Sequence, residues 1–138
     1  MSGSNRGPDA MKPGERTELA RRMWLAWMRR DLDALCECVT DDVTWYPAGN
    51  FKNPWRGKNA IRVAAARESL FPEGQQAEFH HFYELGITVI AEATHRGRAV
   101  NGRAYENDAC MVWEIPGDKI ERLRVYTDLS KIVDLTRP

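Results

Sequence analysis

The sequence predicts one α+β domain in which three helices come first and a strongly curved, mostly antiparallel sheet follows. Apolar residues recur at spacings of three and four from about residue 14 to residue 39, and at every second position through much of the second half. No repeat or low-complexity tract follows residue 13. A chain of 138 residues is long enough for one core. We therefore expect the helices to gather on one face of the sheet.

Composition excludes several kinds of partner. The formal net charge is zero, which removes a general attraction to nucleic acid or to anionic membranes. No segment approaches the roughly 20 apolar residues that a membrane span needs. The three cysteines form no C-x-x-C motif, so neither a disulfide framework nor a structural zinc site is predicted, and a cytoplasmic location is expected. We find no Gly-rich phosphate loop and no nucleophile motif, and we expect no cofactor.

The N-terminal half divides into a leader and three helices. Residues 1–13 are rich in Gly, Ser, Asn and Pro and predict a flexible leader, so that the domain occupies residues 14–138. A first amphipathic helix is predicted over residues 14–30. Its apolar arc contains Leu19, Ala20, Met23, Trp24, Ala26 and Trp27.

Short elements follow this helix. Asp31 fits the N-cap of a second, short helix whose apolar residues run from Leu32 to Val39. Residues 40–42 should break it, a short strand should cover residues 43–46, and a loop should cover residues 48–57. A third helix is predicted from Lys58 to about Leu70, where alanines favour helix and Pro72 ends it.

The C-terminal half is predicted to be a meander of strands. Strands are expected over residues 78–85 and 87–96, followed by a hairpin over residues 101–128 with a Pro-Gly turn. Alternation along the hairpin puts one set of side chains on the buried face. This set contains Tyr105, Asn107, Ala109, Met111, Trp113, Ile115, Leu123, Val125 and Thr127. Asp128 is interpreted as a cap or turn acceptor for the tail.

Several short strings, taken in order, resemble the NTF2-like superfamily, and within it the SnoaL-like and ketosteroid-isomerase-like small proteins. They are Trp27, Arg30 to Leu35, Thr40 to Trp45, Arg56 to Ile61, Gly102 to Asn107, Gly117 to Ile120 and Arg124 to Asp128. The resemblance covers Arg16 to Val133. It implies a cone in which a bent sheet wraps around the helices and encloses a largely apolar pocket, and it implies a homodimer formed through the outer sheet face.

The resemblance does not name a reaction, because the superfamily contains several chemistries. Matching to the ketosteroid isomerase pattern puts Tyr46 in the place of the base, Met23 in that of the tyrosine, and Cys110 or Met111 in that of the acid. Matching to the Asp-Arg-Asp set of limonene-epoxide hydrolases puts Val125, Ala93 and His95 in the three places. Both mechanisms therefore lack the groups that they need.

Four polar residues remain as candidates for catalysis: His95, Tyr46, Tyr105 and Asn107. We expect His95 to act as acid or base, and the other three to bind a developing oxyanion. The alternatives are a strand-end histidine near solvent, a tyrosine in the pocket wall, and a Tyr105–Asn107 pair that satisfies itself. The expected pocket lining is Met23, Trp27, Trp55, Ala93, Ala109, Met111, Leu123, Val125 and Thr127. His80 and His81 are adjacent on a strand and should face opposite ways, so no metal site is predicted.

These observations predict a SnoaL-like protein that binds a small hydrophobic molecule, such as a polyketide, a terpenoid or a steroid-like compound. Catalysis would be a cofactor-independent isomerase, cyclase or dehydratase reaction. The alternative is a ligand-binding or dimeric interaction module without catalysis, and an epoxide hydrolase is the less favoured third hypothesis. The identity of the ligand does not follow from the sequence.

Overall fold

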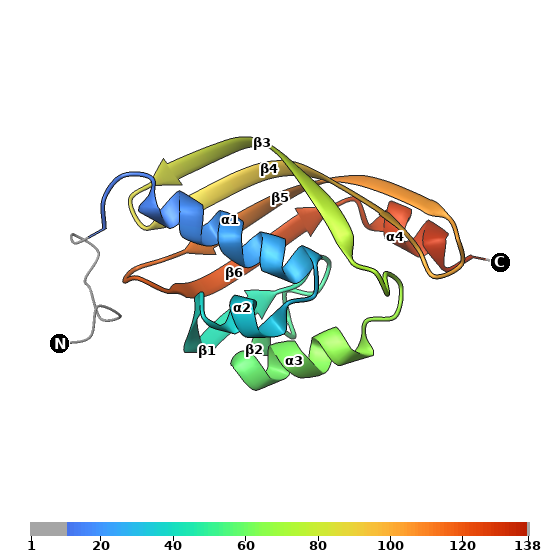
Figure 1. Cartoon of the computed structure of the whole chain (residues 1–138), viewed down its shortest axis with the longest axis horizontal. Helices are drawn as coiled ribbons and strands as arrows, with labels where there is room; N and C mark the ends of the chain where they lie inside the picture. Colours follow the sequence, from blue (N-terminus) through green and yellow to red (C-terminus); the bar gives the residue numbers. More distant parts are fainter. Residues whose placement is uncertain (1–10, 138) are drawn as a thin grey trace.

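The computed structural model describes residues 11–137 and shows helices on the concave side of one curved sheet (Figure 1). In chain order the elements are α1 (Glu15–Met28), α2 (Leu32–Cys36), β1 (Val39–Tyr46), β2 (Trp55–Arg56), α3 (Lys58–Arg67), β3 (Gln75–Leu85), β4 (Thr88–Arg98), β5 (Ala104–Glu114), β6 (Ile120–Thr127) and α4 (Leu129–Leu135). The expected α+β class is confirmed. The predicted leader lies mostly in residues 1–10, outside the described residues.

The six strands form one sheet in the order β2-β1-β6-β5-β4-β3. Strands β3, β4, β5 and β6 pair antiparallel with their neighbours, as the meander predicts, and β1 pairs parallel with β6. The first strand of the chain therefore lies beside the last. This closure brings the inner faces of β1 and β6 next to each other under the helices.

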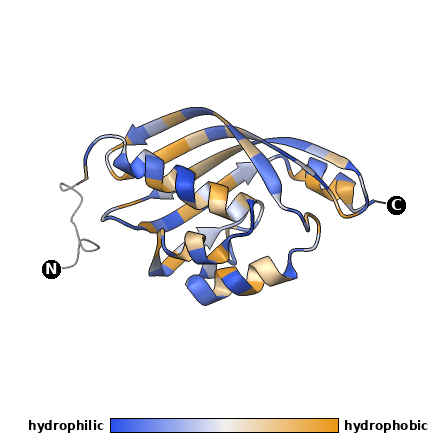
Figure 2. Ribbon diagram, viewed as in Figure 1, coloured by the Kyte–Doolittle hydropathy of each residue, from blue (hydrophilic) through white to orange (hydrophobic). Residues whose placement is uncertain are grey.

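Helix α1 lies across the concave face of the sheet (Figure 1), and its apolar arc is buried as predicted. Along β4, β5 and β6, polar and apolar residues alternate (Figure 2). The apolar set of β5 and β6 is buried, with Met111, Trp113 and Leu123 at 0% exposure. Burial of these large side chains, at about 25 cal/mol per Å² of apolar surface, is the main force that holds the helix to the sheet.

The start of α1 is capped from the far edge of the sheet. Gly14 at the N-cap position has no side-chain oxygen to offer. The Glu84 carboxylate of β3 replaces it and accepts hydrogen bonds from the Gly14 and Thr17 amides at 3.2 and 3.0 Å, and from the Thr17 hydroxyl at 2.7 Å. These bonds satisfy donors that a helix start leaves free and fix α1 against β3.

Several element boundaries differ from the prediction. Residues 40–42 belong to β1, which begins at Val39, because the chain leaves α2 directly into pairing with β6. The loop after β1 contains the two-residue strand β2. Helix α3 ends at Arg67, and the Glu68 carboxylate accepts from the Leu70 and Phe71 amides, which turns the chain away from the helix.

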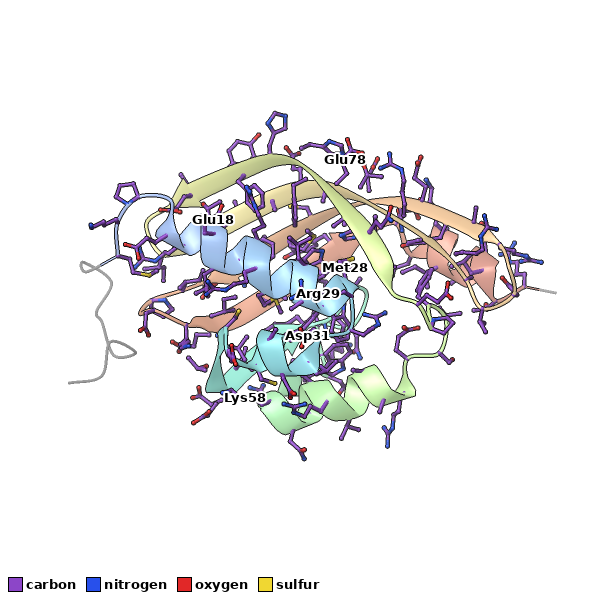
Figure 3. All side chains as sticks on the ribbon, in the orientation of Figure 1. Glu18, Met28, Arg29, Asp31, Lys58 and Glu78 are labelled. Atoms are coloured by element: carbon purple, nitrogen blue, oxygen red, sulfur yellow. The ribbon has the colours of Figure 1, made fainter. Side chains whose placement is uncertain are left out.

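Two predicted caps are confirmed, and one helix was not predicted. The Asp31 side chain accepts from the Ala34 amide, which starts α2. Figure 3 shows Asp31 in the short junction that follows Met28 and Arg29 at the end of α1. The Asp128 side chain accepts from the Ser130 amide and starts α4, for which the sequence pattern indicates only a tail.

A β-bulge in β3 corrects the prediction for its two histidines. The register with β4 shifts between Phe79 and His81, which leaves His80 as an extra residue. His80 and His81 consequently both line a cavity on the outer face of the sheet rather than facing opposite ways. Alternation fails here because a bulge breaks the period of two.

Candidate functional site

The concave side of the sheet contains an open cavity of about 170 Å³. It is bounded by the end of α1, strands β1 and β2 with the start of their connection, strands β3 to β6 and helix α4. Its lining consists of Trp24, Trp27, Met28, Trp45, Pro47, Ala48, Trp55, Gln75, His95, Tyr105, Ala109, Val125, Thr127 and Ile132. No Asp, Glu, Lys or Arg belongs to this lining. We call this space the inner cavity.

Tryptophans form the largest part of the inner cavity wall. Trp27 packs edge-on against Trp45, with ring centroids 4.7 Å apart, and Trp55 packs on Trp45 at 5.1 Å. Trp24 lies 5.9 Å from Trp45 and 6.2 Å from Trp113, which extends the cluster into the core. Tilted and edge-to-face geometries of this kind are favourable for aromatic rings, so these contacts stabilise the wall.

His95 of β4 is held inside this cluster by Trp24. The Trp24 indole N–H donates to His95 Nε2 at 2.8 Å, and the two ring centroids are 5.5 Å apart. An indole nitrogen can only donate, so Nε2 must accept and the ring proton of neutral His95 must be on Nδ1. No other hydrogen bond of the His95 ring is found within residues 11–137. The Nδ1–H group is therefore the polar group that His95 can offer a ligand.

The environment of His95 keeps it neutral near pH 7. Only 6% of the residue is exposed, and burial lowers the pKa of His95 from 6.5 to about 4. No carboxylate of the cavity lining is present to offset this loss of hydration. The alternative of a strand-end histidine near solvent is wrong, because His95 is buried and lies between Ala77 of β3 and Asn107 of β5.

Asn107 and Tyr105 are hydrogen-bonded to each other on the inner face of β5. The Asn107 amide donates to the Tyr105 hydroxyl oxygen at 2.8 Å and to the backbone carbonyl of Asp128 at 2.9 Å. Both N–H groups of the amide are thus used, and the second bond fixes the end of β6 at the start of α4. Burial raises the pKa of Tyr105, so its phenol stays protonated at neutral pH.

The structure separates the expected lining residues into two sets. Five of them line the inner cavity: Trp27, Trp55, Ala109, Val125 and Thr127. The other four, Met23, Ala93, Met111 and Leu123, are at most 2% exposed and do not line it. Tryptophan side chains fill the deeper part of the cone, where these four residues pack in the core.

Tyr46 does not face the inner cavity, which corrects its expected direction. It follows the buried Trp45 in β1 and pairs with Arg124 on the outer side of β6. Its ring packs with Phe51 at 6.3 Å, and the Arg122 guanidinium lies 6.0 Å from its centroid. The side chain of the preceding residue, Trp45, faces inward. Because side chains alternate along a strand, that of Tyr46 faces outward.

From the sequence, Trp24 and Trp45 are expected to be core and pocket lining, and no hydrogen-bonding role is indicated for either. Both tryptophans occur at positions that the patterns identify as core, and their role depends on contacts between elements that are far apart in the chain. The only available signal was the aromatic-rich inner face of the first helix. Gln75 and Ile132 also line the cavity, and they come from an unpredicted strand end and an unpredicted helix.

The outer face of the same sheet has a contrasting set of groups. A shallow hollow of about 790 Å³ is lined by His80, His81 and acidic residues of β4 and β5. His80 Nε2 lies 2.7 Å from the Thr94 hydroxyl, which donates to the Asp108 carboxylate at 2.7 Å. Within residues 11–137 no three His, Cys, Asp or Glu residues are grouped as a metal site would require.

Comparison with known proteins identifies the family to which the chain belongs. A family model, the SnoaL-like domain, matches residues 20–123, and the chain therefore belongs to the SnoaL-like domain family. Its fold is the NTF2-like cone that the sequence resemblance implied. No curated protein matches the chain. None of the described helices is long and apolar enough to cross a membrane.

Three solved structures illustrate the range of proteins with this fold. An NTF2-like protein of unknown function from Burkholderia pseudomallei is 18% identical, with 93% of this chain and 100% of that chain covered and a TM-score of 0.78. A protein assigned as a SnoaL-like polyketide cyclase from Jannaschia sp. is 16% identical over 100% and 98%, with a TM-score of 0.78. An epoxide hydrolase of Mycobacterium tuberculosis, resembling limonene-epoxide hydrolase, is 19% identical over 88% of each chain, with a TM-score of 0.69.

Proposed function

We propose that this protein binds a small, mostly apolar molecule in the inner cavity through a hydrogen bond from His95 Nδ1–H to a carbonyl or hydroxyl oxygen. The observation that carries the proposal is the Trp24–His95 hydrogen bond, which fixes the neutral tautomer and directs the unused donor away from Trp24. Ligand sites typically combine an apolar wall with a few oriented polar groups, and the inner cavity has this composition.

The geometry supports binding better than acid-base catalysis. A general base needs a free lone pair and a pKa near the working pH. The Nε2 lone pair of His95 is occupied by Trp24, and its pKa of about 4 makes it a weak base. The missing carboxylates of the lining weigh against the epoxide hydrolase mechanism as well. If turnover occurs, we expect a cofactor-independent isomerisation or dehydration in which His95 and Tyr105 polarise an oxygen atom.

Acetophenone tests this function because it carries one carbonyl acceptor on a small apolar body. We expect saturable binding by calorimetry, with ethylbenzene, which lacks the acceptor, about five- to ten-fold weaker. The His95→Phe variant should bind the two compounds equally, and His81→Phe on the outer face should behave as the parent protein. Equal affinity for both compounds in the parent protein would refute the proposal.

Nitrogen NMR of the imidazole gives a second measurement that does not depend on affinity. The parent protein should show the Nδ1–H tautomer, and acetophenone should shift the Nδ1 resonance. Trp24→Phe removes the indole donor while keeping an aromatic ring, so the tautomer should no longer be fixed. An Nε2–H tautomer in the parent protein would exclude the proposed arrangement.

We further propose a homodimer formed through the outer sheet face. Phe51 and Tyr126 are 43% and 46% exposed there, and their rings are 5.2 Å apart. Exposed aromatic rings of this kind are enriched in protein interfaces. Light scattering should give the mass of two chains, and Tyr126→Glu should give that of one. A parent protein with the mass of one chain at micromolar concentration would contradict the proposal.

A further inference from the structure

A second hollow lies directly beside the inner cavity and shares two of its walls. This groove, of about 560 Å³, runs along α3, which lies beside β1 and β2 (Figure 1). Trp27 and Trp55 line both the groove and the inner cavity. The remaining groove residues are Pro54, Ala60, Val63, Ala64, Arg67 and Glu68. The two indoles are therefore a partition between the two spaces.

Trp55 is the movable half of this partition. Trp27 belongs to a 14-residue helix and is 8% exposed, whereas Trp55 is half-buried on the two-residue strand β2. This strand is at the edge of the sheet and pairs only with β1, through Trp45 and Thr44. The ring centroids of Trp27 and Trp55 are 6.0 Å apart. Short edge elements with few pairings open at the lowest free-energy cost, so displacement of Trp55 is the route that joins the spaces.

The groove has an apolar floor and one cation, Arg67, that has no ion-pair partner among residues 11–137. Its floor consists of the indoles, the alanines of α3 and Val63, which is 43% exposed. The Glu68 carboxylate is engaged by Arg30 at 2.7 Å and by two backbone amides. Arg67 forms no ion pair with any residue of the described chain. The charge that the groove offers a ligand is therefore positive.

We propose that the groove is a second subsite for the same ligand, which is an elongated apolar anion with an oxygen acceptor at one end and a carboxylate at the other. The acceptor end occupies the inner cavity at His95, the apolar body passes Trp55, and the carboxylate pairs with Arg67. This assignment rests on the proposed function of the inner cavity. The inner cavity is below the roughly 300–1,000 Å³ of most ligand pockets, and the two spaces together fall within that range.

A series of 4-acetylphenyl-alkanoates tests the subsite, because each has the acetophenone carbonyl at one end and a carboxylate on a chain of increasing length. Affinity, measured by calorimetry, should rise by about two- to four-fold for each methylene buried in the groove. It should reach a maximum at the length where the carboxylate meets Arg67. At that length the acid should bind more tightly than its methyl ester.

Two exposed positions on α3 provide the variants. Arg67→Gln should remove the advantage of the acid over the ester, and Val63→Trp should fill the groove and remove the gain from the added methylenes. Neither should change the affinity for acetophenone, which occupies the inner cavity alone. Arg62→Gln is the matched control, because Arg62 is on the same helix, pairs with Asp33 and does not line the groove.

The result separates this inference from the proposed function. Acetophenone that binds normally while the long acids bind no better, with no response to Arg67→Gln or Val63→Trp, would overturn the second subsite alone. Failure of acetophenone itself to bind would overturn the function of the inner cavity. A chain-length optimum that disappears in Val63→Trp, together with an acid preference that disappears in Arg67→Gln, would establish the subsite.

Discussion

The two faces of β4 and β5 use alternate residues of the same strands for opposite purposes. On the concave face, His95 and Asn107 are neutral, buried and hydrogen-bonded to other uncharged groups. One residue further along β4, Arg96 faces outward and pairs with Glu78 at 2.6 Å and with Glu106 at 2.7 Å. The labelled Glu78 in Figure 3 lies on that outer side of β3. Neighbouring residues of one strand thus belong to an uncharged site on the concave face and to a row of ion pairs on the outer face.

This difference shows what kind of chemistry each face can support. An ion in the inner cavity would lose its hydration among the tryptophans, and the polar groups that line this cavity are uncharged. The outer ions keep their water and contribute little to stability one by one. The concave face therefore suits recognition of an oxygen atom on an apolar molecule. The outer face suits contact with water or with another protein surface.

Among substitutions that compare the two faces, removal of the Trp113 side chain should cause the largest loss of stability. Trp113 is fully buried and packs edge-on against Trp24, so Trp113→Ala should lower the free energy of unfolding by about 3–5 kcal/mol. Tyr83→Ala on the outer face should lower it by less than about 1 kcal/mol, because that ring is 47% exposed. Chemical denaturation followed by circular dichroism measures both values.

A conservative change at the same core position sharpens the comparison. The indole nitrogen of Trp113 is buried and has no hydrogen-bond partner within the described chain. Trp113→Phe keeps an aromatic ring and removes this unsatisfied donor, so it should cost less than half as much as Trp113→Ala. Equal losses at Trp113 and Tyr83 would show that the concave core does not dominate stability.

The arrangement of the fold was largely predictable because local patterns agree with it. The apolar arc around Trp24 and the alternation from Tyr105 to Ile115 each identified a buried face that the structure confirms. The bulge at His80 and the short strand at Trp55 were not predictable in this way. A bulge changes the register without changing composition, and a two-residue strand exists only because Trp45 lies beside it.

The site was less predictable because its key contacts join distant segments. Alternation correctly placed Tyr105 and Asn107 on the buried face, and the two side chains form the hydrogen bond that the alternative interpretation expected. The hydrogen bond from Trp24 joins residues 71 positions apart. The effect of this bond on the tautomer and pKa of His95 therefore follows from the folded structure and not from a local sequence pattern. The sequence indicated that acids were missing from the cavity, but not which neutral donor takes their place.

Acidification should produce the next largest effect, and His95 should be its source. The folded-state pKa of His95 is about 4 and the unfolded value is about 6.5, so the unfolded chain binds a proton first as pH falls. Stability contributed by neutral His95 is therefore fully present above pH 6.5 and is lost as pH falls from about 6.5 to about 4. The difference corresponds to about 3 kcal/mol at most, and unfolding free energies measured at half-unit intervals should follow this curve.

Two substitutions assign this pH dependence to one face. His95→Gln provides an amide oxygen that can accept from Trp24 and does not titrate, so it should flatten the curve between pH 6.5 and about 4. His81→Gln removes an exposed imidazole on the outer face and should leave the curve as it is in the parent protein. The contribution of Glu84 to stability also falls on acidification. Hydrogen bonds from Thr17 and Gly14 outweigh the effect of its burial and lower the pKa of this carboxylate. Since this carboxylate titrates below its ordinary value of 4.5, its contribution falls outside most of the histidine window. A curve that persists in His95→Gln but disappears in His81→Gln would place the pH-sensitive group on the outer face and reverse the comparison.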